Sequence, residues 1–298
     1  MEEPPFRTLE RACRRGLFEA LRVPAPPRPR VVRVPEPFAF APLEALADAS
    51  GVCEPLTARP ECGVRFWRPL PRRVRPEPPP RRLRALWVLG PGRHEGERFA
   101  GWRALSAGDG ADAVFAGADP ERLLEEIAAG VDGLFLIAHG DEAGRGFWLR
   151  RGVSRAHLPF AELARALGDA PTRLRFLFAF LCESAEAIHR DFLLPLAEQG
   201  RLDADFGAVL FWGRPLHDHG PRFLAALLKA MASPAAARDP APFLWALARA
   251  RRELYRVAGR EEAARPLAFA LRAQAHPWPP SPERRLQARM LRGTDGGA

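Results

Sequence analysis

The chain has almost no lysine, because every basic residue among its 45 lysines and arginines is arginine except Lys229. It also has no apolar run long enough to cross a bilayer, since its longest runs are broken within about ten residues. Its first five residues, MEEPP, show no basic segment followed by an apolar one, so the sequence has no recognisable secretory signal. We therefore expect a cytoplasmic protein that does not contact a membrane.

Cysteine is scarce and scattered. No two cysteines form a Cys-x-x-Cys pair or show the spacing of a zinc-binding set, which argues against a disulfide framework and a structural metal. The segment His217-Asp218-His219 lacks a convincing second pair of ligands, so we expect no metal and no cofactor. A single cysteine in a special setting is then a candidate nucleophile. The four cysteines are Cys13, Cys53, Cys62 and Cys182.

The charge balance raises the question of nucleic acid. A formal charge of +9 and an isoelectric point near 10.8 are typical of chains that bind phosphates. However, the almost exclusive use of arginine, together with 32 prolines, resembles a GC-rich coding bias rather than a selected phosphate-binding face. No basic motif is interleaved with aromatic residues, as single-strand binders require. Nucleic acid is therefore disfavoured as a partner.

From Leu83 onward, short apolar runs alternate with amphipathic segments of helical length. Unbroken apolar runs are typical of strands buried on both faces, and their alternation with helices predicts an α/β sandwich with a largely parallel sheet. The predicted strands are Ala85–Gly90, Gly133–Ala138, Leu174–Leu181 and Phe206–Gly213, with a further one at Pro266–Gln274. The predicted helices are Pro120–Ala129, Pro159–Leu167, Ser184–Gln199, Pro221–Met231 and Pro242–Tyr255.

The remaining segments define the expected domain organisation. Residues 1–37 are expected to form an N-terminal helix followed by a proline-rich linker, and residues 38–275 a single domain. Residues 276–298 are polar and are expected to form a disordered tail. A basic, proline-rich stretch at 68–84 is expected to be an exposed loop, with proteolytic processing or partner docking as its functional alternatives.

Two reactive side chains stand directly after predicted strands. His139 follows the run that ends at Ala138, and Cys182 follows the run that ends at Leu181. Ligands of open α/β sheets bind at the carboxyl ends of the strands, so both residues are expected at the reactive edge. A helix start after Cys182 would favour its thiolate, and His139 could take the thiol proton and return it to a leaving amine. The backbone N–H groups of Gly140 and Cys182 are the expected oxyanion hole.

These motifs resemble the CHAT family, which belongs to the caspase and separase clan of cysteine peptidases. The resemblance covers roughly residues 38–275, and the histidine precedes the cysteine by slightly less than the roughly 50 residues seen in caspases. Two features depart from the family pattern: Leu181 replaces a small residue, and the tryptophan of the upstream element is missing. Phe180 stands where metacaspases that cut after basic residues carry aspartate, so basic specificity by that device is not supported. The segments that carry the resemblance are Phe40–Leu46, Ala138-His139-Gly140, Cys182-Glu183-Ser184, Gly207–Trp212 with Asp218, and Trp245–Arg251.

The resemblance implies a caspase-like three-layer α/β/α sandwich and a cysteine endopeptidase that acts through His139 and Cys182. It further implies a protein or peptide substrate, an activating partner protein, and a role in bacterial defence or regulated cell death. Asp218 and Asp141 are the candidates for orienting the histidine or lining the substrate pocket, although a solvated loop carboxylate is the favoured interpretation of Asp141. Ser184 is expected to cap a helix. The alternative interpretation is a catalytically silent scaffold or binding module with the same fold.

Overall fold

The computed structural model describes most of the chain from residue 28 to residue 277. The predictions for most of the N-terminal helix, nearly all of the tail and residues 72–83 of the basic proline-rich stretch lie outside the described residues, as do Cys13, Cys53 and Cys62. The expectation that this stretch is an exposed loop is wrong at its start, because Arg68 lies in a strand and Arg68 and Leu70 are 1% and 4% exposed. The described residues are 22–23, 28–40, 43–45, 47–48, 55–61, 63–71, 84–90, 100–107, 113–116, 119–141, 143–151 and 154–277.

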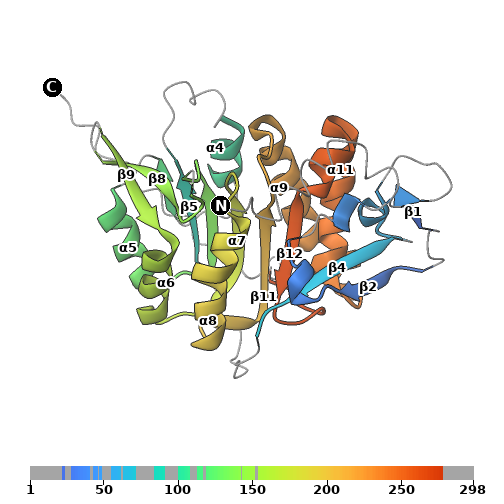
Figure 1. Ribbon diagram of the computed structural model, residues 1–298, viewed down its shortest axis with the longest axis horizontal. Coiled ribbons are helices and arrows are strands. Elements are labelled where there is room, and N and C mark those ends of the chain that lie inside the picture. Colours follow the sequence, from blue (N-terminus) through green and yellow to red (C-terminus); the bar gives the residue numbers. More distant parts are fainter. Residues whose placement is uncertain are drawn as a thin grey trace.

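An eight-stranded sheet forms the centre of the molecule (Figure 1). All neighbouring strands are parallel except one pair, in which the last strand of the sequence runs antiparallel to its neighbour. In spatial order the strands are β2 (Arg30–Arg33), β4 (Val64–Pro69), β12 (Pro266–Ala270), β11 (Leu202–Phe211), β10 (Leu174–Phe180), β7 (Gly133–Ile137), β5 (Ala85–Leu89) and β6 (Ala113–Ala116). Two smaller pairs are β1 (Arg22–Val23) with β3 (Ala47–Asp48), and the hairpin β8 (Gly146–Arg151) with β9 (Ser154–Pro159).

Helices cover both faces of the sheet, which confirms the predicted α/β sandwich (Figure 1). One face carries α5 (Pro120–Ala128), α6 (Phe160–Asp169) and a helical segment made of α7 (Ala185–Ile188), a π-helical turn η5 (His189–Leu193) and α8 (Leu194–Glu198). The other face carries α4 (Ala100–Ala107), α9 (Gly220–Met231) and α11 (Pro242–Ala264), and α10 (Pro234–Arg238) connects the last two. Short 3-10 turns are η2 (Glu36–Phe38), η3 (Leu43–Ala45), η4 (Leu56–Ala58) and η6 (His217–His219).

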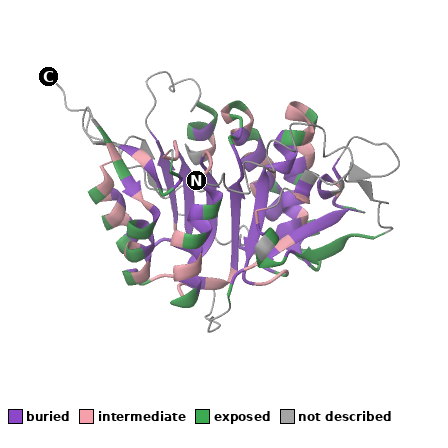
Figure 2. Cartoon of the chain, in the orientation of Figure 1, coloured by how far each residue is buried: buried purple, intermediate pink, exposed green. Residues whose placement is uncertain are grey.

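The central strands supply side chains to both cores by simple alternation. In β10, Leu177 packs on the α5–α8 side, whereas Phe176 and Phe178 pack on the α4–α11 side. Every residue of β5, β7 and β10 is buried, as Figure 2 shows for the middle of the sheet. Unbroken apolar runs therefore marked these strands correctly, because a strand covered by helices on both faces has no solvent-facing side.

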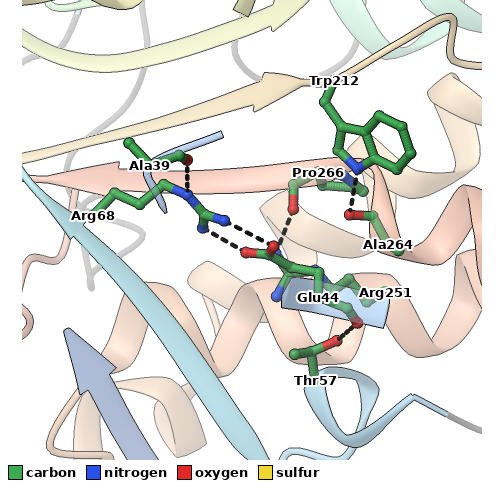
Figure 3. Close-up of polar contacts among 8 residues, drawn as sticks. All are labelled: Ala39, Glu44, Thr57, Arg68, Trp212, Arg251, Ala264 and Pro266. Atoms are coloured by element: carbon green, nitrogen blue, oxygen red, sulfur yellow. Dashed lines mark hydrogen bonds and ion pairs between the residues drawn. The ribbon is translucent and has the colours of Figure 1, made fainter. Parts of the chain in front are cut away.

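A buried charge cluster joins the N-terminal part of the chain to the sheet (Figure 3). The Arg68 guanidinium binds the Glu44 carboxylate through two nitrogens, one of them at 2.8 Å, and its Nε donates to the carbonyl oxygen of Ala39. Arg251 of α11 lies 3.5 Å from the same carboxylate and donates to the carbonyl of Pro266. Glu44, Arg68 and Arg251 are at most 2% exposed. Because the three residues come from η3, β4 and α11, their pairing fixes distant segments against one another.

No helix in the described part of the chain has both the length and the apolar character needed to cross a bilayer.

Candidate active site

The register of the sheet places His139 and Cys182 at the same edge. In the parallel pair β7–β10, Ile137 lies opposite Phe180. His139 lies two residues after Ile137, and Cys182 lies two residues after Phe180. The two segments therefore leave the sheet side by side at its carboxyl edge. The reactive residues thus stand at adjacent strand ends, the position where open α/β sheets bind ligands.

Gly140 shows how closely the two strand exits approach each other. A Cβ atom built on Gly140 would lie 2.4 Å from Ser184 Oγ and 2.5 Å from the carbonyl oxygen of Cys182. Carbon atoms do not approach oxygen so closely without a bond, so only glycine fits at this position. The segment that carries His139 therefore packs directly on the segment that carries Cys182.

The backbone around Gly140 is held by the hairpin. Gly140 forms an isolated antiparallel bridge with Phe147, made by bonds from Asp141 N–H to Gly146 O and from Trp148 N–H to His139 O, each 3.0 Å. These two bonds do not use the N–H of Gly140. In such a pair, the N–H of the bridged residue points away from the neighbouring strand. The N–H of Gly140 is therefore outside the ladder with β8.

The turn after Cys182 has an unusual backbone. Glu183 adopts a φ of 53°, in the left-handed region that residues with a Cβ rarely occupy. Its N–H donates a 2.8 Å hydrogen bond to the carbonyl oxygen of Gly213, and its carboxylate lies 3.0 Å from Arg214 Nε. Strained residues of this kind concentrate at functional sites, where surrounding contacts hold them in place. The sheet neighbour β11 therefore fixes the turn that carries the candidate nucleophile.

Ser184 occupies the N-cap position of α7, but its side chain makes no capping hydrogen bond. Its hydroxyl instead donates a 2.8 Å hydrogen bond back to the carbonyl oxygen of Cys182. The sequence-based expectation of a side-chain helix cap is therefore corrected. Ser184 is fully buried and stabilises the Cys182 turn itself, because the close approach of Gly140 leaves this hydroxyl enclosed.

The electrostatics of Cys182 differ from the expectation that a helix start would favour its thiolate. Burial raises the pKa of the Cys182 thiol, Arg214 and Arg265 oppose this rise with their positive charges, and Glu183 adds to it. Burial dominates because a thiolate loses its hydration there. The resting side chain is therefore a partly exposed, protonated thiol, and a base must remove its proton during a reaction.

His217 is a site residue that the sequence did not single out for this purpose. The ring centroids of His139 and His217 are 5.6 Å apart, and His217 also packs edge-on against Phe180 at 5.3 Å. Phe180 immediately precedes Leu181 and Cys182, so His217 touches structures on both sides of the candidate pair. The contact joins the segment after β7 to η6, and no local sequence pattern predicts it.

The two candidate pocket carboxylates lie in different settings. Asp141 Oδ2 lies 2.7 Å from His157 Nε2, and Asp141 Oδ1 accepts a 2.7 Å hydrogen bond from the N–H of Arg145. Asp141 therefore ties the exit of β7 to the β8–β9 hairpin and is not merely a solvated loop carboxylate. Asp218 is exposed on η6, next to His217. Within the described ranges, no group of three histidine, cysteine, aspartate or glutamate side chains could hold a metal ion.

Comparison with known proteins finds a distant structural similarity and no match to the sequence. No family model and no curated protein match the sequence. Among solved structures, the chain is similar to the separase of the Saccharomyces cerevisiae separase–securin complex, with 12% identity and a TM-score of 0.41. That match covers 63% of this chain and 12% of the separase chain, so this chain spans a small part of the protein it matches.

Proposed function

We propose that the chain is a caspase-like cysteine endopeptidase of the CHAT type, with Cys182 as nucleophile and His139 as general acid and base. The observation that carries the proposal is the packing of Gly140 against the Cys182 turn, which brings a histidine and a cysteine together at adjacent strand ends. Neither residue type would be persuasive alone, since buried cysteines are common and histidines often end strands.

In the proposed reaction, His139 removes the proton from the Cys182 thiol, and the sulfur attacks the carbonyl carbon of a peptide bond. The N–H groups of Gly140 and Cys182 would stabilise the oxyanion that forms. The carbon–nitrogen bond breaks as His139 gives its proton to the leaving amine, which leaves a thioester on Cys182. His139 then takes a proton from water, the resulting hydroxide attacks the thioester, and the acid product leaves as the thiol is regenerated.

The raised thiol pKa fits an enzyme that is silent until it is activated. A partner that moves the Cys182 turn or its charged neighbours would lower this pKa and ease the transfer of the thiol proton to His139. We place such an enzyme in the cytoplasm, in bacterial defence or regulated cell death, with an extended protein substrate bound at the sheet edge beside Asp218 or Asp141. The same raised pKa also favours the second candidate, a catalytically silent caspase-fold scaffold that recruits a partner.

The test uses a fluorescent peptide that ends in a chloromethyl ketone, an electrophilic ketone that alkylates an activated cysteine irreversibly as chloride leaves. The full chain is labelled with and without a cell lysate that supplies an activator, alongside Cys182→Ala, His139→Ala and the control Cys62→Ala. We expect the control to react as fast as the wild type and both site variants to lose labelling. Labelling of Cys182→Ala as fast as that of the wild type would refute the peptidase, and a wild type that stays unlabelled even with the lysate would favour the scaffold.

A further inference from the structure

The loop Trp212–His217, here called the Trp212 loop, contacts both halves of the candidate site. The carbonyl of Gly213 accepts the hydrogen bond from Glu183, and the guanidinium of Arg214 pairs with the same residue's carboxylate. At its far end, His217 packs on His139. The position of this loop therefore determines the geometry of the Cys182 turn and of the histidine at the same time.

The beginning of the Trp212 loop is anchored to the end of α11. The N–H of Trp212 donates to the carbonyl of Arg265 at 3.2 Å, and Arg265 Nη1 donates to the carbonyl of Trp212 at 3.3 Å. The Trp212 indole N–H donates to the carbonyl of Ala264 at 3.1 Å, a contact that Figure 3 shows. The Arg265 guanidinium also lies over the Trp212 ring, 5.1 Å from its centroid. This end of the loop is therefore held by backbone bonds and by one arginine side chain.

The other end of the loop is anchored by Glu262. Its Oε2 accepts a 3.1 Å hydrogen bond from the N–H of Leu216, immediately before His217. Its Oε1 accepts a 2.6 Å hydrogen bond from Arg265 Nε. Nη2 of the same arginine donates a 2.6 Å hydrogen bond to Glu261 Oε1. Glu262 and Arg265 are 6% and 5% exposed. A single buried ion pair thus holds both ends of the Trp212 loop.

Stability alone is a weak explanation for such a pair. Removing two charges from water costs free energy that their attraction often fails to recover, and buried ion pairs are frequently replaced by apolar residues without loss. An ion pair with directional hydrogen bonds does offer a defined geometry, since the arginine fork fixes several acceptors at once.

We propose that Glu262 and Arg265 are positioning residues of the site, which fix the Trp212 loop and through it the Cys182 turn and His139. The catalytic consequence rests on the proposed peptidase function, but the positioning itself does not. The arrangement also gives Arg265 an electrostatic role, because its charge, with that of Arg214, opposes the effects of burial and of Glu183 on the thiol.

The first measurement is the rate at which iodoacetamide alkylates Cys182 in the full chain, followed against pH by mass spectrometry of the Cys182 peptide. Arg265→Gln removes both the positive charge and the hydrogen bonds of the guanidinium group. Arg265→Lys keeps the positive charge but removes the guanidinium geometry. The matched control is Arg65→Lys, which disturbs a buried pair with Asp239 away from the site. We expect Arg265→Gln to raise the thiol pKa, and therefore to slow alkylation severalfold at a pH below it. Arg265→Lys should shift the pKa less, and the control should not shift it.

The second measurement separates positioning from charge. In histidine-labelled protein, the imidazole resonances of His139 and His217 report the geometry of their contact. We expect them to move in Arg265→Lys, which keeps the charge, and to stay unchanged in Arg65→Lys. If an arginine variant fails to fold, Glu262→Gln serves instead, because it breaks the ion pair yet keeps an acceptor for Leu216 N–H.

The inference would be overturned if the histidine resonances did not move in Arg265→Lys or Glu262→Gln. It would also be overturned if the pH dependence of alkylation were the same in Arg265→Gln as in the wild type. Failure of the peptidase proposal gives a different result. A wild type that is inert toward the peptide ketone, but whose thiol and histidines still respond to Arg265, would refute the enzyme and leave the positioning role intact.

Discussion

The N–H of Glu183 donates a 2.8 Å hydrogen bond to the carbonyl oxygen of Gly213, and both residues have a positive φ, of 53° and 66°. The neighbouring strands β10 and β11 are therefore each followed by a residue with a positive φ, and a backbone hydrogen bond joins these two residues. Glycine adopts this conformation readily, whereas glutamate does so at a cost. The cost falls on the residue directly after the candidate nucleophile, which is the kind of position where strain and function coincide.

Glu183→Gly should relieve this strain. The substitution removes the Cβ that disfavours a positive φ, so we expect a gain of about 1 kcal/mol in the free energy of unfolding. It also removes the ion pair with Arg214, whose exposed side chain makes that loss small. Urea unfolding of Glu183→Gly and of Arg214→Gln separates the two effects. A Glu183→Gly protein less stable than Arg214→Gln would show that the backbone is not strained.

Gly140→Ala should disrupt the site through its added methyl group. The new Cβ would overlap Ser184 Oγ and the Cys182 carbonyl, so we expect a loss of about 1–3 kcal/mol in stability. We also expect a loss of ketone labelling, because the Cys182 turn must move. Gly133→Ala, at the start of the strand β7 that leads to Gly140, is the matched control, since its Cβ would meet no atom closer than 3.7 Å. Thermal unfolding and labelling rates check both, and equal behaviour of the two variants would contradict the close approach.

The neighbours of Cys182 should shift its titration in opposite directions. Glu183→Gln removes a negative charge that raises the pKa of the thiol, so the pKa should fall. Arg214→Gln removes a positive charge that lowers the pKa, so the pKa should rise. The pH dependence of iodoacetamide alkylation at Cys182 measures both shifts. Shifts of the same sign would mean that the two charges do not act on the thiol directly.

The sequence predicted the central part of the fold well for a clear physical reason. Strands β5, β7, β10 and β11 are covered by helices on both faces, so an unbroken apolar run is a sufficient signal for them. Strand β4 was not predicted because it contains Arg65 and Arg68. Both arginines are buried, and they form ion pairs with Asp239 and Glu44, which are distant in sequence. A charged residue in a strand looks like a surface residue until its partner is known.

The candidate site divides in a similar way. His139 and Cys182 were predictable because each is the first polar group after a buried strand, and parallel strands end at one edge. His217, Glu262 and Arg265 were not, because they reach the site through loop contacts that no spacing rule encodes. The thiol pKa was expected to be low from the helix start alone, and burial of the turn reversed its direction.

His189 should make the protein less stable in weak acid. Burial between Phe40 and Phe269 lowers the pKa of His189 from 6.5 to about 4. The unfolded chain therefore binds a proton at a pH where the folded chain does not, so stability is full above 6.5 and falls as the pH drops toward 4. The loss should reach about 3 kcal/mol at the lower limit. His189→Phe should abolish this part of the pH dependence in urea unfolding, and an unchanged slope would contradict it.

Glu44→Gln should destabilise the protein more than loss of either arginine beside it. Glu44 is fully buried and carries a negative charge that faces both Arg68 and Arg251, so its loss removes this carboxylate from two buried cations at once (Figure 3). Breaking a buried pair in this way costs about 3–5 kcal/mol. Arg251→Met should cost less, because burial already lowers the pKa of Arg251 to about 10 and leaves its Nε without a hydrogen-bond partner.

Urea unfolding of the single variants and of Glu44→Gln/Arg251→Met tests this order. Removing Arg251 as well removes one of the two cations that face Glu44, so the double variant should lose less stability than the sum of the single losses. Strict additivity would mean that Glu44 and Arg251, 3.5 Å apart, do not interact. In that case the cluster would stabilise the chain through Arg68 alone, and Arg68→Met should then match the loss in Glu44→Gln.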